Sequence, residues 1–472
     1  MPYILTIVGY LVILLSVGVY LASRAKSQEG FMVANRQLTA PVLVATLLAT
    51  WIGSGDVFSV SDLSYHHGYS SLIGSAGGWV GIIVVYFIAA RVRRFGQFTA
   101  PDILEARYNQ WARLLAAITT IIAYVTIVSY QFRGGGWVLN IVSEGRIDES
   151  IAVPIVAIFV ISYTLLAGMI SVAYMDVING VMILGGVFLA LPFLVSNAGG
   201  ISTISQSLPS REHWFLGNMS WVEAVGYFIP TLLLALGSGG MYQRFFSARD
   251  EREARRSVVG WVIGVILIGI ALQSLAVVGS GMFQDLDVNE AGRIILLVAH
   301  DGLPIVVGCI LMAAIVAIII STANSFLLVP ATNIMRDIVQ RFFKPDMTDK
   351  SIVFWSRVVV VILGACAYSL LSFFPRVLSA AYAAYTVYGA GITPALLATF
   401  FWKRATPNAG AISITAGMFM TVAWEVARKA LGEFPLDMPA IYPALVSSML
   451  CLIVISYLEP PPDESKWKPF MD

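Results

Sequence analysis

The chain has 472 residues, of which 58% are hydrophobic and only 12% are charged, and its formal net charge is +1. A soluble protein of this size carries about a quarter charged residues and about half apolar ones. The composition therefore excludes a soluble enzyme, a nucleic-acid-binding protein and a disordered chain. It predicts an all-α polytopic membrane protein whose partners are the lipid bilayer and small solutes, with no nucleic acid among them.

Long apolar runs bounded by charged residues, proline or glycine predict thirteen transmembrane helices. Each run approaches the roughly 20 residues that a helix needs to cross a hydrocarbon layer about 30 Å thick. The first run is longer than the apolar core of a signal peptide and has no basic residues before it, so we expect it to be retained. The expected spans cover residues 3–23, 40–64, 70–91, 112–142, 150–167, 172–195, 221–246, 257–283, 304–335, 352–374, 377–401, 408–428 and 439–458.

Positive charge is distributed unevenly between the loops that join these spans. With the N-terminus placed outside, 22 of the 29 Lys and Arg residues fall on the inner side and seven on the outer side. Short cytoplasmic loops are enriched in Lys and Arg. The bias therefore predicts a multi-pass protein of the cytoplasmic membrane, with its N-terminus outside and its C-terminus in the cytoplasm.

Glycine and serine interrupt two of the spans, at residues 53–59 in the second and 236–244 in the seventh. Each glycine costs up to about 1 kcal/mol in a helix interior, and unpaired backbone at membrane depth is tolerated only where it lines a cavity. The two spans are five apart and would cross in opposite directions. Such paired breaks are typical of the binding site of a secondary transporter. Close helix packing through glycine is the alternative for either segment alone.

The same pairing predicts the domain organisation, a single membrane domain over residues 1–472. Two inverted five-helix repeats would occupy residues 40–195 and 221–401. One extra helix (3–23) would precede them, and two further helices (408–458) and a cytoplasmic tail (459–472) would follow. We expect the protein to function as a monomer.

Polar residues inside the spans are the candidates for function, because ionisable groups at membrane depth are costly. Asp56 lies in the first break, Arg133 in the fourth span and Asp176 near the inner end of the sixth. The ninth span carries Ser321, Thr322, Asn324 and Ser325 within five residues. Their hard oxygen atoms are ligands that an alkali cation prefers, although hydroxyls can also bond to their own helix.

The chain resembles the sodium/solute symporter family, which includes bacterial proline, pantothenate, sialic acid and sodium/galactose symporters. The motifs that carry the resemblance are the broken span at 53–59, Ala167-Gly168-Met169-Ile170-Ser171 followed by Asp176, Gln243-Arg244-Phe245-Phe246, Ser321-Thr322, and residues 402–406 before Gly410-Ala411. The resemblance covers nearly the whole chain, and it implies a LeuT-like inverted five-plus-five helix fold. Two departures, Ala167 in place of a usual glycine and a longer interval from Arg404 to Gly410, lie away from the expected sites.

The resemblance also implies a co-transported sodium ion. The family's main sodium site would use the backbone carbonyls of Ser54, Val57 and Ile318 and the hydroxyls of Ser321 and Thr322. A second sodium site in some members would combine Asp176 with Ser321, Asn324 and Ser325. Asn324 stands where those members have serine, so the second ion is left open.

By the same resemblance, the chain would be a sodium-coupled symporter, not an enzyme, importing a small polar organic solute by alternating access. The side chains expected to face the solute are those of Asp56, Phe58, Ser61, Trp79, Arg133, Ser238 and Gln273. Because a guanidinium group binds a carboxylate with two hydrogen bonds, Arg133 favours a carboxylate-bearing solute, an amino acid or an organic acid. The alternatives are a sugar or another neutral solute and, in a different class, a solute-sensing module without transport.

Overall fold

The computed structural model describes residues 1–22, 27–166, 168–200, 216–284, 286–287, 290–431 and 438–471. Over these ranges the chain is folded into helices joined by short turns, and an isolated bridge pairs Leu38 with Ala248. The expected all-α fold is therefore confirmed. Ala167 of the 167–171 motif and the basic residues Arg24, Lys26 and Arg211 of the charge count lie outside the described residues.

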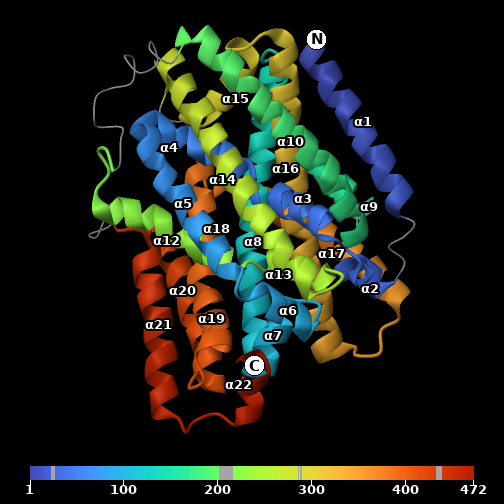
Figure 1. Cartoon of the computed structure of the whole chain (residues 1–472), viewed down its shortest axis with the longest axis vertical. Helices are drawn as coiled ribbons and strands as arrows, with labels where there is room; N and C mark the ends of the chain where they lie inside the picture. Colours follow the sequence, from blue (N-terminus) through green and yellow to red (C-terminus); the bar gives the residue numbers. More distant parts are fainter. Residues whose placement is uncertain are drawn as a thin grey trace.

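Within the described ranges, eleven helical segments are long and apolar enough to cross a membrane. Most of them run along the long axis of the molecule (Figure 1). The helices that make up these segments are α4 (Val60–His67), α5 (Leu72–Val85), α8 (Gln110–Val142), α9 (Glu149–Leu166), α10 (Met169–Asn197), α12 (Trp221–Gly237), α13 (Gly239–Ser247), α14 (Glu251–Met282), α16 (Ile305–Asn333), α17 (Asp349–Ser369), α18 (Val377–Gly391), α19 (Thr393–Phe401), α20 (Pro407–Leu431) and α21 (Ile441–Leu458).

The other α-helices lie outside these eleven segments. They are α1 (Pro2–Ala22), α2 (Gln28–Val33), α3 (Ala40–Trp51), α6 (Ala89–Phe95), α7 (Ala100–Arg107), α15 (Ile294–Asp301) and α22 (Glu464–Met471), with 3-10 or π turns η1 (Ala34–Arg36), η2 (Gly55–Ser59), η3 (Gly68–Ser71), η5 (Ala291–Arg293), η6 (Ile334–Phe343) and η7 (Leu370–Ser372). The apolar stretches Pro2–Gly18 and Ala40–Trp51 are shorter than the spans counted above. The expected count of thirteen spans is therefore not confirmed.

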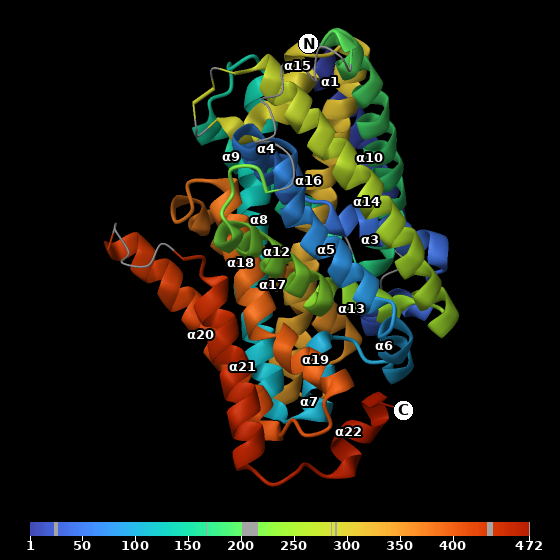
Figure 2. The same cartoon turned by 60° about the vertical axis from the view of Figure 1, so that its left-hand side comes forward.

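The two chain ends lie at opposite ends of the long axis, with α1 beginning at the top and α22 lying at the bottom (Figure 1). Helices α20 and α21 pack against each other and against α18, and they form one flank of the molecule (Figure 2). Helix α16 is buried over almost its whole length. A helix that is apolar on all sides belongs in the interior, and α16 packs there against α8 and α10.

Both predicted helix breaks are confirmed. Helix α3 ends at Trp51, where Ile52 turns to an extended backbone with φ −77° and ψ 105°. Helix α12 ends at Gly237, where Ser238 adopts φ −52° and ψ 113°. Glycine is required by close packing at both points, because a Cβ atom on Gly53 would lie 3.0 Å from Thr322 Cγ2 and one on Gly237 would overlap the side chain of Thr393.

Candidate functional site

A cavity of about 60 Å³ lies between the two helix breaks. Ile52 and Gly53 of the first break and Ser238 of the second are in its wall, together with residues of α5, α8, α14 and α18. Its volume corresponds to roughly four to six water molecules. The two breaks, which lie far apart in sequence, therefore open onto one shared cavity.

Asp56 is the only carboxylate in the wall of this cavity, and no Lys, Arg or His is among the described residues that line it. The Asp56 carboxylate accepts a hydrogen bond from the backbone N–H of Gly53 at 2.9 Å, which holds it at the break. Aromatic side chains form much of the remaining wall: Trp51, Trp79, Tyr130, Phe326, Tyr382 and Tyr385. The cavity thus combines one negative charge with several aromatic rings.

Three of the seven residues expected to face the solute line the cavity, namely Asp56, Trp79 and Ser238. The Ser238 hydroxyl lies 3.1 Å from the Tyr124 hydroxyl, so the second break is tied to α8. These three residues come from η2, from α5 and from the break between α12 and α13, and the fold brings them together.

Phe58, Ser61 and Gln273 are not among the described residues that line the cavity. The Phe58 ring packs edge-on against Trp137, with ring centroids 5.3 Å apart. Ser61 Oγ donates to its own helix at Val57 O, 2.7 Å away. Gln273 Nε2 donates to Ser64 Oγ at 2.6 Å and so fastens α14 to α4.

Arg133 also lies away from the cavity wall. Its guanidinium donates to the backbone carbonyls of Leu371 and Pro375, each at 2.5 Å. Leu371 lies in η7, and Pro375 lies three residues after its end. Arg133 therefore joins α8 to the segment that contains η7, and the structure does not place it among the described residues that line the cavity.

The hydroxyls of Ser321 and Thr322 face the break that follows α3. Ser321 Oγ lies 2.7 Å from Ala49 O and 3.1 Å from Ile318 O. Thr322 Oγ1 lies 3.0 Å from Ile52 O. The result is a group of oxygen atoms shared by α3 and α16, which is the chemistry that sodium requires.

Two contributors to this oxygen group were missed in the sequence. The carbonyl oxygens of Ala49 and Ile52 accept hydrogen bonds from these hydroxyls. The sequence had instead predicted the carbonyls of Ser54 and Val57 as ligands. Gln131 of α8 accepts from the Ser54 backbone N–H at 3.2 Å, and its Nε2 is buried without a partner among the described residues. A glutamine in an apolar helix is a signal that could have identified Gln131, because buried amides need partners.

Asp176 pairs with the guanidinium of Arg244, at 3.5 Å. Both side chains are almost fully buried, with exposed fractions of 1% each. Thr46 Oγ1 donates to Asp176 at 2.6 Å, and Arg244 donates to Ser325 Oγ at 2.8 Å and to the hydroxyl of Thr50. Arg244 thus contacts two of the side chains expected at the second sodium site. Arg244 belongs to a family motif and was counted among the 22 basic residues of the inner side, but the structure buries it completely instead of placing it at a solvated helix end.

Asn324, another expected ligand of the second sodium ion, has a buried Oδ1 atom without a partner in the described part of the chain. An unpaired buried acceptor is unfavourable. This oxygen is therefore available to accept a hydrogen bond or to bind a cation.

An ion pair joins two helices above the cavity. Arg376, just before α18, donates to both carboxylate oxygens of Asp62 in α4, at 2.5 Å and 2.7 Å. Asp62 is buried, and such two-point pairs are the stronger kind. His66 lies 3.7 Å from the same carboxylate. The pair holds the second half of the broken helix against α18.

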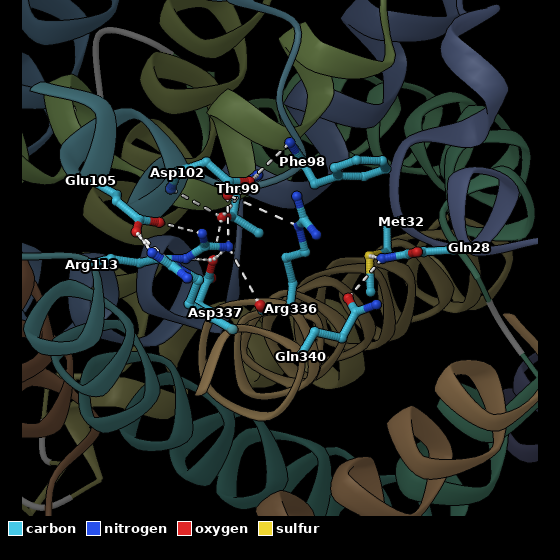
Figure 3. A network of polar contacts seen from close by, with 11 residues as sticks. Gln28, Met32, Phe98, Thr99, Asp102, Glu105, Arg113, Arg336, Asp337 and Gln340 are labelled. Atoms are coloured by element: carbon cyan, nitrogen blue, oxygen red, sulfur yellow. Dashed lines mark hydrogen bonds and ion pairs between the residues drawn. The ribbon is translucent and has the colours of Figure 1, made fainter. Parts of the chain in front are cut away.

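A larger ionic network gathers side chains of α7, α8 and η6 (Figure 3). Arg113, at the start of α8, pairs with Asp102 at 2.7 Å, Glu105 at 2.5 Å and Asp337 at 2.7 Å. Burial alone would raise the pKa of Glu105, but hydrogen bonds from Arg341 and Arg113 outweigh it and hold the pKa below its usual value. The network therefore joins α7, α8 and η6. In sequence, only the Thr99–Asp102 spacing of a capping box marks this place.

Next to the network, Phe98 is placed between two arginines. The guanidinium carbon of Arg36 lies 5.3 Å from the ring centroid and that of Arg336 lies 5.1 Å from it. Gln28 Nε2 donates to Gln340 Oε1 at 2.9 Å (Figure 3). These contacts tie α2 and η1, which precede the broken helix, to the end of the α16 segment.

Comparison with known proteins supplies the context for this geometry. A model of the sodium:solute symporter family matches residues 31–419. The chain is 25% identical to the high affinity choline transporter 1 of Homo sapiens, over 96% of this chain and 84% of that protein. It is 24% identical to the high-affinity proline transporter PutP of Bacillus subtilis (strain 168), over 97% of this chain and 98% of that one.

Two solved structures share the fold. A Na⁺-coupled sialic acid symporter matches with a TM-score of 0.83 and 20% identity, covering 98% of this chain and 99% of that one. Mhp1, a nucleobase-cation-symport-1 family transporter, matches with a TM-score of 0.63 and 11% identity, covering 93% and 97%. The expected LeuT-like fold class is thereby confirmed.

Proposed function

The chain belongs to the sodium:solute symporter family and is a transporter, not an enzyme; from this premise we propose that it couples sodium entry to the import of a small organic solute bearing a positively charged nitrogen. The observation that carries the proposal is the cavity wall, where Asp56 is the one carboxylate among aromatic rings. A cation is attracted both by a carboxylate and by the faces of Trp and Tyr rings.

This proposal narrows the solute class expected from the sequence. A simple organic acid would need a basic partner, and Arg133 donates instead to the carbonyls of Leu371 and Pro375. An amino acid satisfies both the expectation and the cavity, because its ammonium group suits Asp56. A quaternary ammonium compound is the second candidate, favoured by the aromatic wall. The proline and choline transporters among the relatives carry solutes of these two kinds.

For sodium we propose the oxygen group between α3 and α16. An ion held by Ser321, Thr322 and the carbonyls at the break would fix the two helices in register and so prepare Asp56, which follows the break, for the solute. Binding of one ligand then favours binding of the other, and the linkage is reciprocal. When the bound sodium ion moves inward across the membrane, the membrane potential contributes about 2.3 kcal/mol per charge per 100 mV.

We further propose one sodium ion per cycle. Arg244 supplies a positive charge beside Asp176 and contacts the Ser325 hydroxyl, where a second ion was expected. Repulsion between this guanidinium and a sodium ion disfavours the second site. Parallel uptake of radioactive sodium and labelled solute tests the stoichiometry: a ratio near one is expected, and a ratio near two would contradict it.

Alternating access would use the closures at the two ends. The Asp62–Arg376 pair must separate to admit solute from one side, and the contacts of Phe98 and Gln28 must separate to release it on the other. The two repeats at 40–195 and 221–401 are proposed as the units that move, with the N-terminus outside.

The test is uptake into proteoliposomes with and without an inward sodium gradient. Radiolabelled proline and choline are the first solutes, with lactate and galactose as the anionic and neutral comparisons. We expect sodium-dependent uptake of a nitrogen cation or zwitterion, and its loss in Asp56→Ala. Sodium-driven uptake of lactate or galactose alone would contradict the proposed solute class, and uptake indifferent to sodium would contradict the coupling.

A further inference from the structure

A basic groove of about 900 Å³ lies apart from the transport cavity, between α6 and the first turns of α14. Five arginines and one carboxylate line it: Arg91, Arg94, Arg252, Arg255, Arg256 and Glu251. Both elements lie toward the end of the molecule that carries the C-terminus (Figure 2). This is the end expected to face the cytoplasm.

Two helical segments form the groove, and each places arginines toward one end of it and an apolar residue toward the other. On α14, Arg252, Arg255, Arg256 and Val259 are spaced by three and four residues and so share one face. Before and within α6, the same spacing puts residues 87, 91 and 94 on one side. The two segments run in opposite directions, so both place their apolar residue at one end of the groove and their arginines at the other.

Most of the positive charge in the groove has no carboxylate to neutralise it. Arg94 pairs with Glu251 at 3.1 Å, and Arg256 lies 3.8 Å from Glu253. For Arg91, Arg252 and Arg255, no carboxylate partner is found in the described ranges. The Arg255 guanidinium lies over the Tyr86 ring, 5.3 Å from its centroid, which orients this side chain toward the groove.

The other end of the groove is apolar and exposed. Phe87, Val259 and Phe401 are exposed by 62%, 49% and 55%. Side chains of this kind are stable when acyl chains cover them, whereas the arginines require an anion in water or in the headgroup layer. The groove therefore matches a molecule with a phosphate at one end and a hydrocarbon chain at the other.

We propose that this groove is a binding site for an anionic phospholipid, whose phosphate-bearing headgroup is held by Arg91, Arg252 and Arg255 while its acyl chain lies along Phe87, Val259 and Phe401. Free phosphate has the same headgroup chemistry, but it would leave the apolar end uncovered. A lipid in this position would bridge α6 and α14. It would therefore stabilise the end of the molecule that carries the C-terminus.

The test measures lipid binding to the purified full-length protein by native mass spectrometry, and thermal unfolding in nanodiscs of phosphatidylcholine with or without phosphatidylglycerol. We expect phosphatidylglycerol to bind more tightly than phosphatidylcholine and to raise the unfolding temperature. Each arginine near a charged headgroup contributes about a fivefold factor in affinity. The triple variant R91Q/R252Q/R255Q should therefore weaken phosphatidylglycerol binding by at least tenfold, while R91K/R252K/R255K should keep most of it.

The matched control is K344Q/K350Q/K468Q, which removes three exposed charges from the same expected side. Equal binding of both lipids to the wild type, or equal losses in the glutamine triple and the control, would overturn the proposal. So would stabilisation by inorganic phosphate as large as that by phosphatidylglycerol. None of these readouts depends on transport, so the outcome is separate from that of the uptake experiment.

Discussion

Ser321 and Thr322 place two hydroxyls against carbonyls that the end of α3 leaves without helical partners. We expect the double variant Ser321→Ala with Thr322→Ala to raise the sodium concentration for half-maximal uptake by at least tenfold, because two of the oxygen ligands are lost. Thr164→Ala is the control, since the buried Thr164 hydroxyl donates to its own helix at Val160 O, 2.8 Å away. A sodium dependence unchanged in the double variant would remove these hydroxyls from the site.

Asp176 and Arg244 form a buried pair in which each charge needs the other. Removing one partner of such a pair leaves an uncompensated charge, at a cost of about 3–5 kcal/mol. We therefore expect Asp176→Asn to lower the free energy of unfolding by about 3 kcal/mol. Denaturant unfolding in detergent micelles measures the change.

The control for this pair is Glu144→Gln, which breaks an ion pair of comparable length with Arg146 at the surface, where the side chains are 56% and 75% exposed. Its expected effect is below about 1 kcal/mol. Adding Arg244→Met to Asp176→Asn should cost less than the sum of the two single changes, because both remove the same interaction. Simple additivity would show that the two residues act independently.

At the scale of helices, the Asp62–Arg376 pair connects α4 to the start of α18, and in the proposed transport cycle it closes the cavity on one side. We expect Asp62→Asn to weaken this closure and to increase the accessibility of the cavity from the outside. A cysteine at Ser75, which lines the cavity, reports the change through its reaction rate with an impermeant thiol reagent in a background without the native cysteines. The rate should rise several-fold in Asp62→Asn.

Arg428→Gln is the comparison for this experiment. Arg428 lies on the same expected side, and its ion pair with Glu425 is long, at 4.0 Å. It should leave the reaction rate at Ser75→Cys unchanged. If Asp62→Asn reacts no faster than this comparison variant, the ion pair has no part in closure.

The helix breaks could be predicted from the sequence because their cause is local. Glycine and serine at 53–59 and 236–244 destabilise a helix whatever its neighbours are. Helices α3 and α12 end at or just before these segments. The partners of Arg133 and Arg113 could not be predicted in this way. Arg133 meets Pro375, 242 residues away, and Arg113 meets Asp337, 224 residues away. Which direction a side chain takes depends on the rotation of its helix against distant neighbours, and periodicity does not specify that rotation.

At the scale of the whole molecule, the distribution of Lys and Arg and the positions of the two chain ends both distinguish one end of the long axis from the other. The ends lie at opposite poles of the long axis (Figure 1), as an odd number of crossings requires. The ionic network of Arg113 and the basic groove lie toward the pole of the C-terminus. Positive charge is enriched on the cytoplasmic side of membrane proteins, which supports placing this pole in the cytoplasm.

The orientation leads to a final prediction about access from the two sides of the membrane. Glu144, in the loop after α8, and Ser465, in α22, are both exposed and belong to opposite expected sides. With Cys309, Cys366 and Cys451 replaced by alanine, an impermeant maleimide should label Glu144→Cys in intact cells. Ser465→Cys should react only after the cells are permeabilised, which is also the control that the site is reactive. Labelling of Ser465→Cys alone in intact cells would reverse the orientation, and the direction of the proposed sodium-driven step would reverse with it.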